Sequence, residues 1–267
     1  MNPLINPYRD MAPEAVRRLI REEKITGQTA GMCSGYAQAN LVVVPKDIAY
    51  DFLLFSQRNP KACPVLEVSD AGSRELHQIA ADADIARDIP KYRIYEHGEM
   101  TGEYTDVEKF WRDDLVSFLI GCSFSFEGEL IEAGVPVRHI EENRNVPMYL
   151  TNIPCRPAGI FRGSMVVSMR PIPGELIPRA VLSTGAMPKV HGAPVQIGDP
   201  AAIGIGDINK PDFGEAVTIR PGEVPVFWPC GVTPQAALMA SKPDFAITHS
   251  PGHMFLTDVK NTCLKYE

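Results

Sequence analysis

The sequence lacks the features that mark membrane-spanning, fibrous and disulfide-rich proteins. Its longest apolar runs are short, such as residues 41–44, and fall well below the roughly 18 apolar residues of a membrane span. Its 21 glycines follow no period, which excludes a collagen-like chain. Its 6 cysteines are few for 267 residues, and none forms a Cys-x-x-Cys pair. We therefore expect reduced thiols and no disulfide framework.

Positive charge is also scarce. The chain has 26 Lys and Arg against 33 Asp and Glu, which gives a net charge of −7. This balance argues against broad binding to nucleic acid or to anionic membranes. The first ten residues contain Asn and Pro where a signal peptide would have a basic and then an apolar region. We predict a cytoplasmic protein with a small-molecule partner, and we leave homo-oligomerisation open.

Short apolar segments and turn residues alternate along the chain, which predicts a mixed α/β class with an α+β hairpin region. His97-Gly98 lies between two strand-like segments and is typical of a hairpin turn. The clearest predicted helix covers 107–120, where Val107, Trp111 and Leu115 lie on one helical face. Further helices are predicted at 11–24, 48–57, 127–133, 175–184 and from Thr233 onward, and strands at 41–44, 63–68, 91–96, 99–104, 165–169, 217–219, 224–228, 246–249 and 254–257.

No repeat and no flexible linker interrupts the chain. We therefore predict one domain over residues 1–267, in which any two lobes share a broad interface. Residues 151–206 differ from the rest because they are rich in Gly and Pro and hold 5 basic residues against 2 acidic ones. Arg156 and Arg170 belong to this locally basic stretch. We predict that both bind substrate carboxylate, because a planar guanidinium pairs with a carboxylate through two hydrogen bonds.

Two turns carry small nucleophilic side chains. Cys122, Ser123 and Ser125 lie between two predicted elements, where backbone N–H groups at a helix N-terminus can bind an anion. The alternative is a capped turn around a buried cysteine, which is the usual environment of this residue type. Cys230 lies between a strand and a helix, where a thiol can become acidic and nucleophilic. Strand-to-helix turns also arise for packing alone, and this alternative stays open.

Three histidines are acid–base candidates. His139 lies close to Glu141 and Glu142 in a charged stretch, and a neighbouring carboxylate orients an imidazole and raises its pKa. The alternative is a solvated run of charges. His249 and His253 are four residues apart, but the Pro251-Gly252 turn between them breaks the helix that would bring both imidazoles to one zinc ion. We therefore predict no metal site, and a site completed by a third ligand such as Asp258 or His139 stays as the alternative.

Long and unusual sequence strings run from about residue 6 to residue 260. They cover 35–41, 55–60, 121–127, 138–142, 145–149, 151–155, 191–195, 220–228, 230–234, 247–249 and 251–255. By these strings the chain resembles a bacterial hydro-lyase family that is related to D-glutamate cyclase. The resemblance implies two interlocked α/β subdomains around a shared cleft, and a lyase that removes water without a cofactor. One relative of this kind cyclises D-glutamate to 5-oxo-D-proline.

We predict on this basis a hydro-lyase that acts on a small carboxylic or amino acid. We expect segments 121–127, 138–149, 230–233 and 249–253 to meet at one cleft. The catalytic candidates, with His253 first and His139 second, are His253, His139, His249, Glu127, Glu141, Cys122 and Cys230. The substrate-binding candidates are Ser123, Ser125, Arg144, Asn145, Tyr149, Asn152, Arg156, Arg170, His191 and Asp199. The alternatives are a cysteine-dependent acyl-transfer enzyme or hydrolase, and a non-catalytic protein that binds a small carboxylate.

Overall fold

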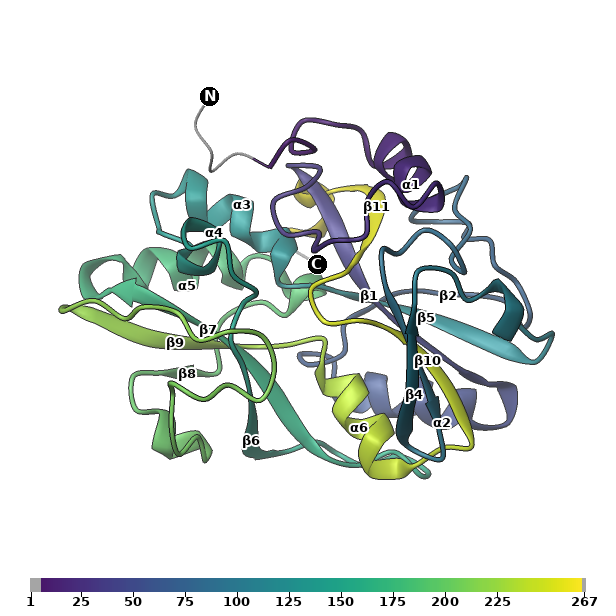
Figure 1. Cartoon of the computed structure of the whole chain (residues 1–267). Helices are drawn as coiled ribbons and strands as arrows, with labels where there is room; N and C mark the ends of the chain where they lie inside the picture. Colours follow the sequence, from purple (N-terminus) through teal and green to yellow (C-terminus); the bar gives the residue numbers. More distant parts are fainter. Residues whose placement is uncertain (1–5, 266–267) are drawn as a thin grey trace.

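The chain forms two antiparallel sheets, of seven and four strands, with helices packed around them (Figure 1). The computed structural model describes residues 6–265. The sequence-based prediction for the first ten residues therefore falls partly outside the described range. Among the described residues, no helix is both long and apolar enough to cross a membrane. The mixed α/β class is confirmed, and each described strand pairing is antiparallel.

The seven-stranded sheet has the order β2-β5-β1-β10-β3-β4, with β11 also paired to β1. Its central strand, β1, sends Leu41 and Val43 into one apolar cluster and Val42 and Val44 into another, because side chains alternate across a strand. The strands are β1 (Tyr36–Pro45), β2 (Val65–Val68), β3 (Tyr92–Glu96), β4 (Glu99–Tyr104), β5 (Leu115–Gly121), β10 (Phe245–His249) and β11 (Phe255–Lys260).

Strands β10 and β11 behave as one strand that is interrupted by residues 250–254. Ile247 and Thr248 pair with Val43 and Val42, and Phe255 pairs with Ala39 further along the same side of β1. We call residues 250–254 the strand interruption. The imidazole of His249 replaces part of the lost ladder, because the backbone N–H of Leu41 donates to its Nδ1 at 3.1 Å. The interruption is therefore held by side-chain as well as backbone hydrogen bonds.

The four-stranded sheet has the order β6-β7-β9-β8. Its strands are β6 (Met148–Pro154), β7 (Ser164–Pro173), β8 (Gln196–Ile197) and β9 (Glu223–Pro229). In chain order they lie between β5 and β10, so the polypeptide leaves the larger sheet, builds the smaller one and returns (Figure 1). Trp228 of β9 packs in one apolar cluster with Phe126 and Leu130. This cluster joins the smaller sheet to the helix that follows β5.

The helices cover the sheets through apolar faces. Phe52 and Phe55 of α2 pack against one face of the larger sheet. Val16 and Ile20 of α1 pack against Leu256 of β11. The α-helices are α1 (Pro13–Arg21), α2 (Lys46–Arg58), α3 (Phe124–Glu132), α4 (Arg138–Glu141), α5 (Ile177–Gly185) and α6 (Thr233–Ser241). The 3-10 turns are η1 (Glu108–Phe110), η2 (Gly174–Leu176), η3 (Pro188–Val190), η4 (Pro200–Ile203) and η5 (Asn261–Leu264).

Two secondary-structure predictions are wrong. Residues 107–120 form η1 and then strand β5, whose seven residues are all buried between β1 and β2. A central strand is apolar on both faces, so its continuous run imitates the face of a helix. Residues 217–219 form no strand, because the backbone N–H and carbonyl of Thr218 form hydrogen bonds with side chains instead of with a neighbouring strand. Its N–H donates to Glu142 at 3.3 Å, and its carbonyl accepts from Arg138 at 3.5 Å.

Candidate functional site

Strand β5 ends at Gly121, and the chain turns at once into α3. No other residue type fits at Gly121, because an added Cβ would lie 1.9 Å from the carbonyl oxygen of Lys189. This tight turn places Cys122 and Ser123 directly before the helix, and Glu127 on its first turn. Glu127 is only 2% exposed, and a carboxylate at that depth requires charged partners. The sequence of the turn therefore decides where this carboxylate lies.

Glu127 has two charged partners from distant elements. Its Oε1 lies 3.1 Å from Nε2 of His139, on α4. The same oxygen accepts hydrogen bonds from Nε of Arg170, at 3.2 Å, and from Nη2. Arg170 on β7 also donates to Oγ of Ser123 at 3.2 Å and to Oγ of Ser168 at 3.0 Å. We call these five residues the Glu127 cluster.

Charge and aromatic contacts hold the Glu127 cluster in place. Burial raises the pKa of Glu127, but the nearby charges of His139 and Arg170 outweigh it, so the pKa lies below its ordinary value. The guanidinium carbon of Arg170 lies 5.1 Å from the ring centroid of Phe126, in cation–π contact. The ring of Phe124 stacks on His139 with a centroid separation of 6.1 Å. Glu127 is therefore a carboxylate at neutral pH, in a rigid setting.

A pocket of about 430 Å³ lies beside the Glu127 cluster. Glu127, Phe124 and Gln38 line it, together with the exposed cationic side chains of Arg9 and Arg144. The volume is in the range of small-molecule sites, which run from about 300 to 1,000 Å³. Arg170 is fully buried and does not line it, and its donors are used by Glu127 and the two serines. The pocket thus presents two carboxylates, those of Glu127 and Glu132, and two cations to a ligand.

The histidines of the interrupted strand have a different environment. Burial lowers the pKa of His249 to about 3, and its Nδ1 is engaged by the backbone of Leu41. Burial also lowers the pKa of His253, whose Nδ1 lies 3.0 Å from the carbonyl of Pro251. Ser250 donates to Oε1 of Glu103 at 2.7 Å nearby. Backbone groups, and not a carboxylate, orient these two imidazoles.

The two candidate cysteines are buried and protonated. Burial raises the pKa of Cys122, and it raises the pKa of Cys230 to about 11. Both pack in one apolar cluster with Val146, Met148 and Met254. A nucleophilic cysteine needs a lowered pKa and access to substrate. These surroundings fit the alternative of buried packing residues at both turns.

The four segments expected at one cleft lie close together around an apolar cluster, but only segments 121–127 and 138–149 supply residues that line the pocket beside the Glu127 cluster. Segment 121–127 contributes Cys122 and Phe124, segment 138–149 contributes Val146 and Met148, and segment 230–233 contributes Cys230 and Val232. The fourth segment reaches the cluster through its next residue, Met254. The side-chain amide of Asn145 also donates to the carbonyl of Pro251 at 3.5 Å. The Glu127 cluster lies at one edge of this meeting point, through Ser123 and His139.

Two further candidates are buried near the Glu127 cluster. Burial lowers the pKa of His191 to about 4, and its Nδ1 lies 3.0 Å from the carbonyl of Lys61. Ser125 donates to the carbonyl of Gln38 at 3.3 Å and accepts from its N–H at 2.9 Å. Ser125 therefore ties α3 to β1, which is a structural task.

The remaining candidates lie elsewhere. Glu141 pairs with Arg138 at 2.9 Å and is 41% exposed. Tyr149 is a core residue that donates to the carbonyl of Ile208 at 2.6 Å. Asn152, Arg156 and Asp199 are exposed, on β6, after β6 and before η4, respectively. The structure does not bring these five side chains into the Glu127 cluster.

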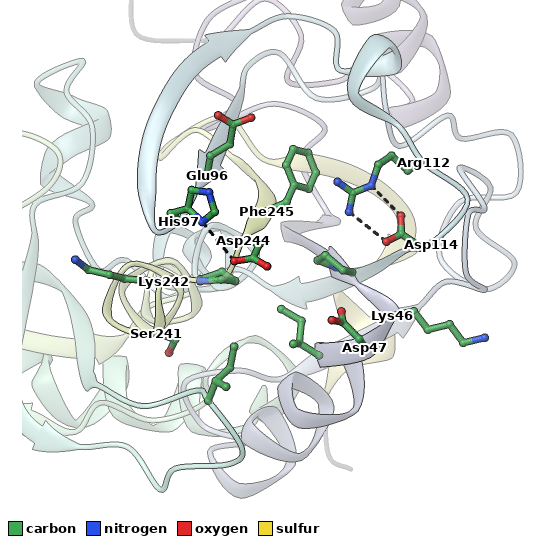
Figure 2. Close-up of a pocket in the computed structure, with 14 residues that line it drawn as sticks. Lys46, Asp47, Glu96, His97, Arg112, Asp114, Ser241, Lys242, Asp244 and Phe245 are labelled. Carbon is green, nitrogen blue, oxygen red and sulfur yellow. Dashed lines mark hydrogen bonds and ion pairs between the residues drawn. The ribbon is translucent and has the colours of Figure 1, made fainter.

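A second, more open groove lies at the far end of the larger sheet, between α2, the β3–β4 hairpin and the end of α6 (Figure 2). His97 lies 3.3 Å from Asp244 there, and Arg112 pairs with Asp114 at 2.9 Å. These are exposed ion pairs, which contribute little free energy. None of the predicted site residues lines this groove. It therefore has no part in the site that the sequence indicates.

Sequence reasoning missed Gln38, Ser168 and Arg9. Ser168 could have been found, because residues two apart on a strand share a face, and Arg170 was already a candidate. Gln38 and Arg9 carry no local signal, since only the packing of the N-terminal segment on α3 places them in one pocket. Within residues 6–265, no group of three or more His, Cys, Asp and Glu side chains could hold a metal ion.

Comparison with known proteins identifies close relatives. The family model described as "D-glutamate cyclase" matches residues 116–258. A protein of Clostridium beijerinckii named "Putative hydro-lyase" is 71% identical over 97% of this chain and 99% of its own length. Relatives of the same designation are 62% identical in Thermoanaerobacter sp. (96% of this chain, 97% of theirs) and in Bacillus subtilis (95% and 99%). The family match includes the Glu127 cluster.

Proposed function

Because the chain belongs to the D-glutamate cyclase family, we propose that it is a hydro-lyase that removes water from a small amino or carboxylic acid. The substrate that we propose is D-glutamate, which the description of the matching family model names and which would cyclise to 5-oxo-D-proline. The observation that carries the proposal is the buried Glu127 carboxylate, held by His139 and Arg170 at the wall of a pocket. A structural ion pair has no need of a neighbouring pocket, whereas a proton-transfer group does.

The reaction defines what the site must do. The α-amino nitrogen of glutamate forms a bond to the γ-carboxyl carbon, and one C–O bond of that carboxyl group breaks. The ammonium starts with three protons, of which one stays on the new amide, and the other two leave with the oxygen as water. The net charge of −1 is unchanged. The enzyme must therefore move two protons from nitrogen to oxygen and hold the negative charge that develops on oxygen.

Glu127 and His139 suit this proton transfer. Glu127 is ionised at neutral pH and lines the pocket, so it can accept a proton from the substrate ammonium. Nε2 of His139 lies 3.1 Å from the same carboxylate. It stabilises Glu127 both when Glu127 accepts a proton and when Glu127 returns one. Since both protons travel from one atom to another in the same substrate, one pair can accept and return them. This assignment ranks His139 above His253, because only His139 has a carboxylate partner.

The cations have separate tasks. Arg170 acts as a positioning residue, since its donors are directed at Glu127, Ser123 and Ser168. Arg9 and Arg144 line the pocket and are exposed, which suits the capture of the two substrate carboxylates. Arg144 also donates from Nη1 to the carbonyl of Ala216, so only part of its guanidinium faces a ligand. The basic stretch around Arg156 has no place in this assignment. An acidic protein with a few cations at one pocket favours a small anionic substrate over a large polyanion.

The proposal is tested by turnover. Purified protein is incubated with D-glutamate, L-glutamate and related amino- and hydroxy-dicarboxylates, and the product is identified by the loss of one water in mass spectrometry. We expect Glu127→Gln to lower kcat by about 10²–10⁴-fold. Glu129→Gln is the matched control on the same helix, where Glu129 pairs with Lys265, and should retain wild-type kcat. Binding of these acids without turnover would instead support a non-catalytic carboxylate-binding protein.

A further inference from the structure

Gly128 lies in the middle of helix α3, where a glycine weakens the helix. It has four residues of Phe124–Glu132 on either side. Glycine in a helix interior is less favourable than alanine, because it loses more conformational freedom on folding. The usual reasons for a glycine at such a position are a positive φ, close packing against other protein atoms, or the close approach of a ligand.

The structure excludes the first two reasons at Gly128. Its φ does not lie in the left-handed region. Apart from its own helix backbone and its chain neighbours, no atom of residues 6–265 lies within 4 Å of an added Cβ. Packing does explain other glycines, since an added Cβ would lie 1.9 Å from the backbone of Lys189 at Gly121 and 1.9 Å from the side chain of Asn40 at Gly231. Gly128 instead leaves open space.

This open space belongs to the pocket beside the Glu127 cluster. Residues three or four apart share one face of a helix. Five residues of α3 with this spacing line the pocket: Phe124, Glu127, Gly128, Ile131 and Glu132. Phe126 and Leu130 lie on the other face, in the apolar cluster of Trp228. Gly128 is thus the centre of the helix face that the pocket exposes to a ligand.

The backbone at Gly128 offers a contact without hydrogen bonds. Inside a helix, the N–H and the carbonyl of a residue bond to groups four residues away. A carboxylate or an ammonium group therefore finds no partner on Gly128, whereas methylene groups can pack against it. Glu127 lines the pocket one residue earlier. A substrate whose carbon chain lies on Gly128 has its polar groups beside this carboxylate.

We propose that the carbon chain of the substrate lies on the backbone of α3 at Gly128, and that any side chain at this position would occupy the place of the substrate. The inference rests on the proposed function for the class of substrate, a small amino dicarboxylate. It adds the part of the pocket wall that binds the methylene groups. Gly128 acts in binding and specificity, through the room that it leaves, and takes no part in proton transfer.

The test separates stability from binding. Gly128→Ala should raise the Tm by about 2 °C, because alanine favours the helix and its methyl group meets open space. The same variant should raise Kd by about tenfold or more, since one carbon atom in a well-filled pocket has an effect of this size. The probe is D-2-amino-4-phosphonobutyrate, a glutamate analogue whose phosphonate has no carboxyl carbon for the amine to attack. Titration calorimetry gives Kd, and scanning calorimetry gives Tm.

Gly185→Ala is the matched control. Gly185 is the last residue of α5 and does not line the pocket, and an added Cβ would lie 3.7 Å from Cβ of Ala193, which is ordinary contact. This variant should leave Kd unchanged. Gly128→Leu extends the series, and its larger side chain should raise Kd by more than about a hundredfold.

A Kd within about twofold of wild type in Gly128→Ala would overturn the proposal, and so would a Kd of that size in Gly128→Leu. A lower Tm in Gly128→Ala would also overturn it, because protein packing would then require the glycine. Failure of the wild-type protein to bind the probe would have the same consequence. Failure of the proposed function is measured separately, as turnover of D-glutamate. A protein that loses affinity in Gly128→Ala and still removes no water would keep the Gly128 contact and lose the lyase.

Discussion

Two regions of the molecule carry buried histidines, and their partners differ. In the Glu127 cluster, His139 faces a carboxylate at 3.1 Å, and that carboxylate lines a pocket. At the strand interruption, His249 is engaged by the backbone of Leu41, and His253 lies against the carbonyl of Pro251. Burial lowers the pKa of His249 and of His253. The contrast teaches that the partner of an imidazole, rather than its depth, decides whether it suits proton transfer.

The largest expected effect is a difference in kcat between histidine variants of the two regions. We predict that His139→Gln lowers kcat by about 10²–10⁴-fold, the usual loss for an acid–base group. His253→Asn should lower it by less than about tenfold, since its ring is not paired with a carboxylate. The exposed His77 supplies the control, His77→Gln, with an expected kcat equal to wild type. If His253→Asn proved the more damaging variant, the ranking drawn from sequence would be correct and the comparison would reverse.

The second prediction concerns the stability of the Glu127 cluster. Glu127→Gln leaves the guanidinium of Arg170 buried without a full countercharge, and we expect a loss of about 3 kcal/mol in the free energy of unfolding. The double variant Glu127→Gln/Arg170→Met should recover part of this loss, because it removes both charges. Urea denaturation measures each value. Glu129→Gln, at a half-buried surface pair, should cost under about 1 kcal/mol. A loss of that small size in Glu127→Gln would contradict a tightly coupled cluster.

The third prediction uses the pH dependence of stability. Burial lowers the pKa of His249 to about 3 and that of His191 to about 4, from 6.5. At a pH between these lowered pKa values and 6.5, the unfolded chain binds protons that the folded protein excludes. The free energy of unfolding therefore falls as the pH falls below 6.5. Each histidine should contribute a slope of about 1.4 kcal/mol per pH unit. The measurement is urea denaturation at a series of pH values.

The variants His249→Asn and His191→Asn assign that slope. Each variant should reduce the slope by the contribution of one protonated histidine, about 1.4 kcal/mol per pH unit. A slope that both variants leave unchanged would mean that these two imidazoles become protonated in the folded protein as readily as in the unfolded chain.

The smallest expected effect is that of the cysteines. Because burial raises the pKa of Cys122 and of Cys230, we expect Cys122→Ala and Cys230→Ala to keep kcat within about threefold of wild type. Iodoacetamide should modify the exposed Cys263 first, and peptide mass spectrometry would show the order. Loss of most activity in Cys122→Ala, with the fold intact, would restore the cysteine-dependent acyl-transfer alternative.

Local features of the fold were predictable from the sequence. The hairpin at His97-Gly98 forms as expected, with φ values of 50° and 79° at the two turn residues. Both lie in the left-handed region, which a two-residue turn requires and which Gly adopts at little cost. Strand β5 was not predictable as a strand, because apolar residues face both of its sides and the run lacks the polar alternation of a half-buried strand. Its partners β1 and β2 decide its conformation, and they lie far away in the sequence.

The candidate site, like the fold, was predictable from the sequence only in part. The sequence indicated Glu127, His139 and Arg170 as separate candidates, and it offered Glu141 and Glu142, two and three residues further on, as partners of His139. The fold pairs His139 with Glu127 instead, while Glu141 bonds to Arg138. Neighbours on a short helix point in different directions, so closeness in sequence gives little information about contact.

The sequence by itself determined the family, the locally coded turns and the residue types available for chemistry. These follow from long strings of residues or from backbone preferences that act over a few positions. Only the tertiary structure decided which candidates meet. Glu127, His139 and Arg170 come from α3, α4 and β7, and Gln38 comes from β1. Packing of the two sheets brings the first three into one cluster and Gln38 to the pocket beside it. The sequence could not determine these contacts, because burial of apolar surface is non-directional and selects no single pair of distant residues in advance.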